Sequence, residues 1–324
     1  MKPSILKPAL TATISSGLSS FIWGAPGIGK SDIVHEVSKD LNRDIIDLRA
    51  ILLDPIDLRG LPNIDDNKTT WTVPSFLPQK GSGILFLDEL NQAPQAVQAA
   101  CFQLVLDRKL GDYTLPDGWD IIAAGNRLSD RAAAQRMPSA LANRFVHLDL
   151  DPDLNDWCQW ALQNDIAHEV IAFLRFRPEL LHNFKPNDRS FPTPRSWAFI
   201  SNLIQQDVDA EVEVELTLGT IGEAAGGEFR SFLRLYKDLP TIDSIFIDPQ
   251  NAKVPTEPSA RFAIASALSK RTTSDTLSNV GIYLDRLPDE FVAFTVKDLV
   301  KRTPDIQQTP AFTEWAVNHT NIFN

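Results

Sequence analysis

One segment constrains this chain more than any other: Gly24, Ala25, Pro26, Gly27, Ile28, Gly29, Lys30 and Ser31. It fits the pattern G-x-x-x-x-G-K-[ST], with an apolar run before it and a helical pattern after it, as the motif requires. Glycines let backbone N–H groups point inward as an anion nest, and the following helix adds the positive end of its dipole. We therefore predict a nucleoside-triphosphate site in which Lys30 reaches the β- and γ-phosphates and Ser31 binds Mg²⁺.

A second informative segment is the apolar run at residues 84–87, which is followed by Asp88 and Glu89. Such a run predicts a strand that is buried on both faces, as parallel α/β sheets require. Ligands of open α/β sheets bind at the carboxyl ends of the strands, where these two carboxylates would lie. We expect Asp88 to hold Mg²⁺ and Glu89 to polarise the attacking water. The alternative is a solvated loop after a core strand, and the complete phosphate-binding motif argues against it.

The arrangement of apolar runs predicts the fold class. Five strand candidates alternate with helical patterns, at residues 20–23, 44–48, 84–87, 121–125 and 146–150. This alternation predicts a doubly wound parallel sheet, hence an α/β domain over residues 1–150. The glycine-rich motif makes this domain one of the P-loop NTPase type. From residue 151 onward the pattern is helical. We expect an all-α lid domain at 151–238 and a helical C-terminal extension at 239–324, with a loop-like stretch at 239–258.

Composition indicates the cellular compartment of the protein and the kinds of partner that it can bind. No apolar run approaches about eighteen residues, so we expect no membrane insertion, and residues 1–8 lack the apolar core of a signal peptide. The two cysteines, Cys101 and Cys158, both occur in apolar helical patterns. We therefore expect a cytoplasmic protein without disulfides or structural zinc. The net charge of −11 argues against a broad basic surface for nucleic acid.

Four further features suggest contacts or chemistry. Residues 59–76 and 108–119 each predict a projecting hairpin, although the first could equally be an ordinary solvated loop. Asn126 ends the strand at 121–125, where an amide can orient the lytic water, and its alternative is a turn residue. Arg195 lies in the first turn of a helix, where the dipole disfavours a cation. An anionic partner would explain this placement, and a plain surface arginine is the alternative.

Together, these motifs resemble a known family. The segments 24–31, 84–89, 121–126 and 139–145, in this order, resemble those of AAA+ ATPases. Three further segments, 88–93, 141–145 and 193–195, are similar to the MoxR branch, which is related to magnesium-chelatase-type motors. The sequence departs from that branch at Asn143, where relatives often carry an aspartate.

The resemblance implies roles for individual residues. Asn126 matches the sensor 1 position, Arg195 matches the sensor 2 arginine of the lid, and the two hairpins match elements that face the pore of a ring. Arg144 matches the arginine finger that reaches the ATP of the neighbouring subunit. Three other arginines crowd the same region and stay open as alternatives to Arg144: Arg127, Arg131 and Arg136.

The resulting expectation is an ATP- and Mg²⁺-dependent motor. It would act as a homo-oligomeric ring, expected to be a hexamer, and would remodel or activate a protein client. The resemblance also implies a partner with a von Willebrand factor A domain. One alternative is a DNA-directed motor or nuclease-associated translocase, which Lys68, Arg108 and Lys109 permit but the acidic balance opposes. Another is a slow nucleotide switch with a scaffolding role, against which Glu89 argues.

Overall fold

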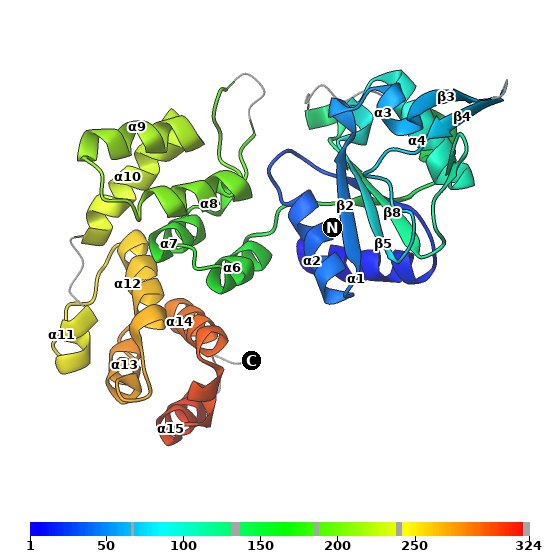
Figure 1. Ribbon diagram of the computed structural model, residues 1–324. Coiled ribbons are helices and arrows are strands. Elements are labelled where there is room, and N and C mark those ends of the chain that lie inside the picture. The colour runs from blue at the N-terminus through cyan, green and yellow to red at the C-terminus, as the bar shows by residue number, and fades with distance from the viewer. Residues whose placement is uncertain (66–67, 131–136, 185–187, 238–241, 320–324) are drawn as a thin grey trace. The chain divides into compact units, whose positions relative to one another are not determined.

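The computed structural model describes residues 1–65, 68–130, 137–184, 188–237 and 242–319. They form two compact units, Met1–Asp153 and Leu154–Asn324. The first unit is an α/β structure and the second is helical, which agrees with the predicted fold class (Figure 1). Within the described residues, no helix combines the length and the apolar character needed to cross a membrane.

The first unit is built on a sheet of five parallel strands, β1 (Ser20–Trp23), β2 (Asp44–Arg49), β5 (Gly83–Asp88), β8 (Trp119–Gly125) and β9 (Val146–Asp149). Their order across the sheet is β2-β5-β8-β1-β9, and every neighbouring pair is parallel. Because the strands run in one direction, their carboxyl ends meet at one edge of the sheet. Strand β1 therefore delivers the glycine-rich segment to the same edge at which β5 and β8 end.

Helices cover both faces of this sheet. Phe21 packs in a core cluster with the helix α4 (Gln95–Asp107), whereas its neighbour Ile22 packs in a second cluster with α1 (Pro3–Ser15) and α2 (Lys30–Asp40). Strands β5 and β8 alternate between the two clusters in the same way. Since side chains in a strand alternate between faces, apolar residues at every position are needed to bury both, and the predicted doubly wound sheet is confirmed.

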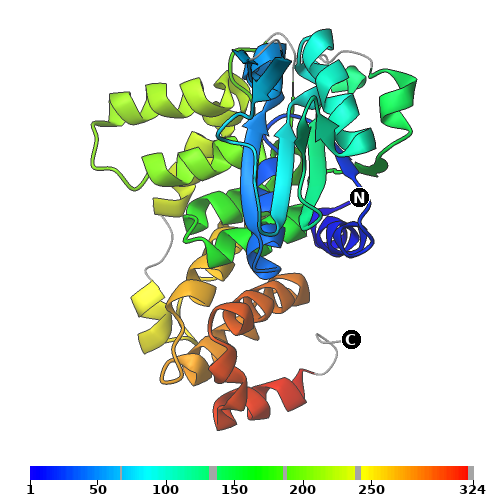
Figure 2. The same cartoon turned by 45° about the vertical axis from the view of Figure 1, so that its right-hand side comes forward.

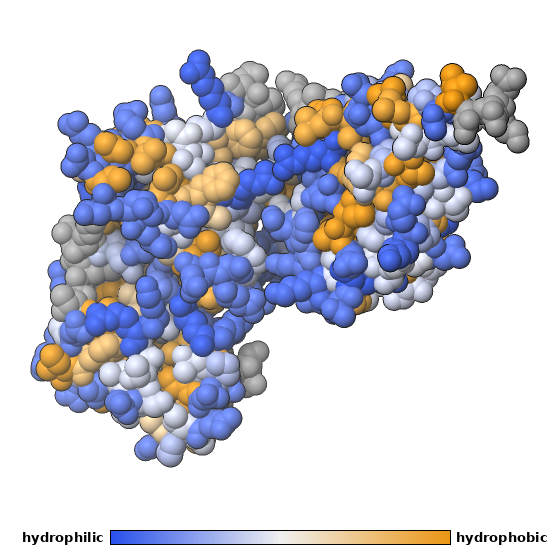
Figure 3. Space-filling model, in the orientation of Figure 1, coloured by the Kyte–Doolittle hydropathy of each residue, from blue (hydrophilic) through white to orange (hydrophobic). Residues whose placement is uncertain are grey.

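The first predicted hairpin is confirmed. After the 3₁₀ helix η1 (Ala50–Leu52) and the helix α3 (Pro55–Arg59), the strands β3 (Leu61–Asp65) and β4 (Lys68–Thr72) pair antiparallel. Their apolar side chains are exposed, with 77% of Ile64 and 63% of Leu61 accessible. Apolar surface is accordingly visible at this end of the unit (Figure 3). An exposed two-stranded hairpin with apolar side chains is a surface suited to contact another chain.

The second predicted hairpin forms but does not project. Strands β6 (Lys109–Leu110) and β7 (Tyr113–Thr114) are only two residues each. Leu110 and Tyr113 are buried in the core, and the Tyr113 hydroxyl donates to the Pro78 carbonyl at 2.6 Å. The Arg108 guanidinium donates to the carbonyl oxygens of Pro116 and Trp119. The expectation of projection was wrong, because the apolar residues between the polar ones anchor the hairpin to the sheet unit.

Short helical segments lie in the connections that follow β5 and β8. They are the 3₁₀ helices η2 (Leu90–Gln92) and η3 (Leu128–Asp130) and the helix α5 (Ser139–Ala142).

The second unit contains only helices and connections among its described residues (Figure 2). The helices are α6 (Leu154–Gln163), α7 (His168–Phe176), η4 (Pro178–Leu180), α8 (Pro194–Leu203), α9 (Ala210–Ile221), α10 (Glu223–Lys237), α11 (Ile242–Ile247), α12 (Pro258–Arg271), α13 (Leu277–Leu284), α14 (Asp289–Arg302), η5 (Pro304–Gln308) and α15 (Pro310–Asn318). Helix α11 lies where a loop was expected, because Ile242 and Ile245 share one turn and are buried together.

Helix α12 connects the two parts of this unit. Ala263 packs with the cluster around α7, whereas Ile264 packs with the cluster that includes α13 and α14. Helices α7 and α14 are also joined by an ion pair in which the Arg175 guanidinium donates to Asp298 at 2.5 and 2.8 Å, and the Asp298 side chain is 3% exposed. The proposed border between lid and extension at residue 238 stays a prediction, and the two segments share packing within one unit.

His168 makes the stability of the helical unit sensitive to acid. It is 5% exposed, and its Nδ1 accepts from the Arg302 guanidinium at 3.3 Å. Burial, together with the charges of Arg302, Lys270 and Arg175, lowers the pKa of His168 to about 3. In the unfolded chain the histidine pKa is about 6.5. As the pH falls below that value, this histidine therefore binds a proton in the unfolded chain before it does so in the folded chain.

We expect the free energy of unfolding to fall by roughly 1 kcal/mol per pH unit on acidification from about pH 6.5 toward the folded-state pKa. Urea unfolding of the whole chain at pH 7 and pH 5 measures this loss. His168→Gln, which keeps an acceptor for Arg302 but cannot titrate, should remove most of it. An identical pH dependence in the two proteins would show that another group is responsible.

Candidate functional site

The glycine-rich segment forms a tight loop between β1 and α2. Gly27 and Gly29 have φ angles of +75° and +91°, in the left-handed region that favours glycine. A Cβ atom on Gly24 would lie 2.5 Å from Ile28 Cδ1 and 3.0 Å from the Leu150 carbonyl oxygen. Gly29 is also the N-cap residue of α2. The loop therefore has the backbone conformation and the helix N-terminus that an anion nest requires.

Lys30 and Asn126 are brought together beside this loop. The Lys30 ammonium donates to the carbonyl oxygens of Gly24 at 2.7 Å and Ala25 at 3.0 Å, and to Asn126 Oδ1 at 3.0 Å. The ammonium has hydrogen-bond donors only, and its three partners here are oxygen acceptors. Phosphate oxygens are acceptors of the same kind, so the ammonium could bind them as well. The predicted phosphate-binding lysine and the predicted sensor therefore belong to one site.

Ser31 and Asp88 form the second contact of the site. The Ser31 hydroxyl donates to Asp88 Oδ2 at 2.7 Å, while Asp88 Oδ1 accepts from the Glu89 backbone N–H at 2.9 Å. A hydroxyl and a carboxylate oxygen side by side are the hard ligands that Mg²⁺ prefers, usually together with phosphate oxygens and water. The two residues predicted to bind the metal therefore fit that role.

Glu89 lies at the turn from β5 into η2. Its φ of +56° puts a non-glycine residue in the left-handed region, a conformation that costs on the order of 1–3 kcal/mol and often marks functional sites. The turn ends β5 directly after Asp88 and leads into η2. Sequence reasoning predicted Glu89 as the residue acting on water, and the structure places its backbone next to the Ser31–Asp88 pair.

Asn91 is a buried residue beside the site whose contacts sequence reasoning missed, since it entered only as part of a family motif. Its side chain is fully buried, donates from Nδ2 to the Asn126 carbonyl at 2.8 Å and accepts at Oδ1 from the Asn126 N–H at 3.2 Å. A Cβ on Gly125 would lie 2.1 Å from that Oδ1, so only glycine fits there. Asn91 thus fixes the backbone of Asn126 relative to the turn that carries Glu89.

Removal of the Asn91 amide should be costly. Asn91→Ala leaves the buried N–H and C=O of Asn126 without these partners, and each such group costs about 1–3 kcal/mol. We expect a loss of roughly 2–5 kcal/mol in the unfolding free energy, measured with urea. Asn63→Ala, on the exposed strand β3, is the matched control and should change it little. Equal unfolding midpoints for Asn91→Ala and the unmodified chain would contradict the assigned contact.

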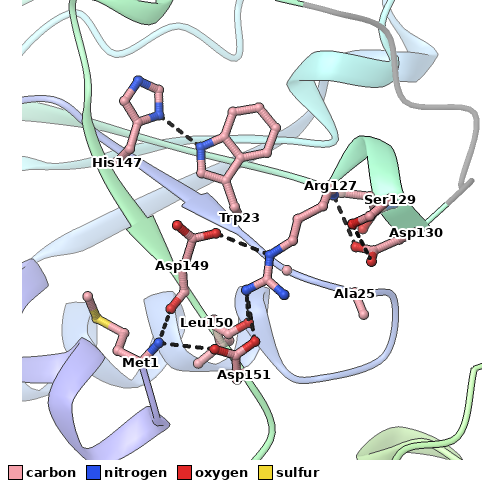
Figure 4. Close-up of polar contacts among 12 residues, drawn as sticks. Met1, Trp23, Ala25, Arg127, Ser129, Asp130, His147, Asp149, Leu150 and Asp151 are labelled. Carbon is pink, nitrogen blue, oxygen red and sulfur yellow. Dashed lines mark hydrogen bonds and ion pairs between the residues drawn. The ribbon is translucent and has the colours of Figure 1, made fainter.

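Arg127 is engaged within its own unit (Figure 4). Its guanidinium donates to Asp149 Oδ1 at 3.1 Å, to the Leu150 carbonyl at 2.9 Å and to Asp151 Oδ1 at 2.9 Å. Although partial burial opposes it, the hydrogen bond and charge of Arg127 lower the pKa of Asp151. The Met1 amino group also contacts Asp151, at 3.3 Å. Arg127, which follows Asn126 directly, thereby links the end of β8 to the end of β9.

The remaining predicted arginines are placed differently. Arg144 is exposed in the turn after α5, and its side chain has no hydrogen-bond or ion-pair partner within the described parts of the chain. Arg195 is exposed at the start of α8 in the helical unit, so its approach to the nucleotide loop stays a prediction. Arg131 and Arg136 lie outside the described residues.

Comparison with known proteins agrees with this geometry. Residues 19–145 match the family model of the AAA domain of the dynein-related subfamily. That range includes the nucleotide loop, the carboxylate pair, Asn126 and Arg144. The sheet unit therefore has the fold of an AAA+ nucleotide-binding domain. No curated protein matches the chain.

Solved structures also match the chain, at low identity and low TM-score. NtrX from Brucella abortus in complex with ATP is 16% identical with a TM-score of 0.43, over 98% of this chain and 67% of that one. The Holliday junction branch migration motor RuvB from Thermotoga maritima is 13% identical with a TM-score of 0.36, over 97% of this chain and 85% of that one.

Proposed function

We propose that this chain is a Mg²⁺-dependent ATPase that assembles into a ring, expected to be hexameric, and uses hydrolysis to remodel or activate a protein client. The observation that carries the proposal is the pair of contacts at the sheet edge, Lys30 with Asn126 and Ser31 with Asp88. They join the end of β8 and the end of β5 to the glycine-rich loop. Lys30, Ser31 and Asp88 correspond to the residues with which P-loop enzymes bind the phosphates and Mg²⁺.

Each residue then has a specific task. The N–H groups of the loop and the Lys30 ammonium bind the phosphates, and Ser31 and Asp88 hold Mg²⁺. Held by these two residues, Mg²⁺ would supply positive charge to neutralise the phosphates. Glu89 polarises the attacking water and accepts its proton, while Asn126 orients that water. Asn91 keeps Asn126 in place through its two buried hydrogen bonds.

The ring part of the proposal concerns Arg144. An exposed arginine with no described partner of its own is available to a second copy, whereas Arg127 donates to three acceptors in its own unit. An arginine supplied in trans contributes about 10³–10⁵ to the rate of P-loop enzymes. Arg195 would act on the same nucleotide from the helical unit. The proposed cytoplasmic location rests on the cysteine usage. The proposed von Willebrand factor A domain partner rests on the resemblance to the MoxR branch.

A protein client is favoured over DNA by the β3–β4 hairpin. Its exposed side chains include Leu61, Ile64 and Trp71, which suit an apolar protein surface better than a phosphate backbone. The Arg108 guanidinium, which could have bound DNA, is instead bonded to carbonyl oxygens of its own unit. ATP turnover that rises with added DNA and falls steeply with salt would reverse this preference.

The lysine of the loop provides the first test. Lys30→Ala should weaken ATP binding by roughly 10- to 100-fold, the loss expected when a charge-assisted hydrogen bond is removed. Titration with a fluorescent ATP analogue measures the affinity. Lys39→Ala removes an exposed lysine from the last turn of the same helix and should bind normally. Unchanged affinity in Lys30→Ala would refute the assignment of the loop.

A further inference from the structure

The residue before the nucleotide loop makes a side-chain contact that the proposed chemistry does not use. Trp23 ends β1, and its indole Nε1 lies 2.8 Å from Nδ1 of His147 on β9 (Figure 4). The two rings stack, with 5.9 Å between their centroids and 25° between their planes. An indole N–H can only donate. His147 Nδ1 is therefore the acceptor and carries no proton.

The contact with Trp23 also determines which hydrogen-bonding role the second ring nitrogen of His147 has. His147 Nε2 lies 2.8 Å from the Ala142 carbonyl oxygen. Since Nδ1 accepts, the proton of the neutral ring is on Nε2, which donates to Ala142. The same carbonyl also accepts from the Phe145 backbone N–H at 3.2 Å. His147 thus connects the last residue of β1 to the turn that follows α5.

The turn in question carries Arg144. On one side of Arg144, the Ala142 carbonyl is held by His147; on the other, the buried Phe145 ring packs edge-on against Phe21 at 5.5 Å. Both anchors lead to β1, the strand that continues into the nucleotide loop at Gly24. The exposed arginine therefore lies between two anchored residues. Phe145 contacts β1 directly, and Ala142 is connected to β1 through His147. Strand β1 also positions the phosphate-binding loop of the same subunit.

We infer that Trp23 and His147 are positioning residues for Arg144. They hold the turn in the conformation that presents the guanidinium to the nucleotide of a neighbouring copy. The inference rests on the proposed function of Arg144 in trans. Small displacements of a catalytic group reduce the rate by large factors. A looser turn should therefore slow hydrolysis of the ATP bound to the neighbouring subunit. Nucleotide binding in the subunit that carries the turn should be unchanged.

The first measurement separates turnover from binding. His147→Ala should lower kcat of the assembled protein by about three- to tenfold, the effect of one net hydrogen bond, with KM for ATP unchanged. His147→Gln can place an N–H where Nε2 lies and should recover most of the loss. His35→Ala, which removes an exposed histidine on α2, is the matched control. A normal kcat in His147→Ala, or a changed KM alone, would overturn the inference.

The second measurement identifies which subunit needs His147. In a mixture of Glu89→Gln and Arg144→Ala chains, active sites combine the loop and Glu89 of an Arg144→Ala chain with Arg144 of a Glu89→Gln chain. Adding His147→Ala to the Glu89→Gln chain should lower the activity of the mixture. Adding it to the Arg144→Ala chain should have no effect. The reverse pattern, or equal losses in both, would show that His147 acts on its own subunit's site and would overturn the inference.

Two outcomes distinguish a failure of the proposed shared site from a failure of the positioning role of His147. If the parent mixture recovers no activity, the shared site itself is wrong, and the role of His147 falls with it. If the parent mixture is active and His147→Ala changes nothing in either chain, only the positioning role is wrong.

Discussion

The substitution Glu89→Gln is expected to bind ATP almost normally and to hydrolyse it about 10²–10⁴ times more slowly. The amide is nearly isosteric with the carboxylate but cannot accept the proton of the attacking water. The contacts that bind phosphate and metal, Lys30 with Asn126 and Ser31 with Asp88, do not involve the Glu89 side chain. Single-turnover hydrolysis and nucleotide titration on the same sample measure the two quantities separately.

A matched control for this variant exists in the same unit. Residues 1–153 contain two glutamates, and the other one, Glu36, pairs with Lys7 near the surface. Exposed ion pairs of this kind contribute little, so Glu36→Gln should turn over ATP normally. Normal turnover in Glu89→Gln would remove Glu89 from the proposed role in water activation and would favour a different catalytic base.

The substitution Arg144→Ala is expected to leave ATP binding unchanged and to lower the turnover rate of the assembled protein by a factor of about 10³–10⁵. The physical reason is that the guanidinium neutralises charge that develops on the transferred phosphoryl group, and that it comes from a different copy. The rate should therefore rise with protein concentration in the unmodified chain and stay low at all concentrations in the variant. Steady-state turnover across a concentration series measures this.

The control for Arg144→Ala is Arg59→Ala, an exposed arginine at the end of α3, which should retain full turnover. Should Arg144→Ala hydrolyse ATP normally, the trans arginine would have to be Arg131 or Arg136. Arg127 is a poor replacement, because its guanidinium is bonded to Asp149, to Asp151 and to the Leu150 carbonyl.

The parts of the structure that the sequence predicted are those determined by local pattern. Apolar residues at every position from 84 to 87 can only be buried by a strand covered on both faces, and all four are fully buried. The glycine-rich segment requires a strand before it and a helix after it, and both are present. The meeting of Ser31 with Asp88 follows from the common direction of parallel strands, which brings their carboxyl ends to one edge.

The parts that could not be predicted depend on register and on contacts between distant segments. The Asn91–Asn126 hydrogen bonds require the turn after β5 to reach the end of β8, and only the close fit of Gly125 hints at it. Arg127 pairs with carboxylates 22 and 24 residues away. The second hairpin was expected to project because of its polar residues, and Leu110 and Tyr113 hold it against the core instead.

The shared active site is tested most directly by mixing the two inactive variants. Glu89→Gln and Arg144→Ala are each expected to be nearly inactive alone. In a head-to-tail ring assembled at random from equal amounts of both, about one interface in four combines an intact Glu89 with an intact Arg144 from the next copy. We predict that ATP turnover of the mixture rises far above that of either variant. A mixture as inactive as its components, although both bind ATP and assemble, would contradict a site shared between subunits.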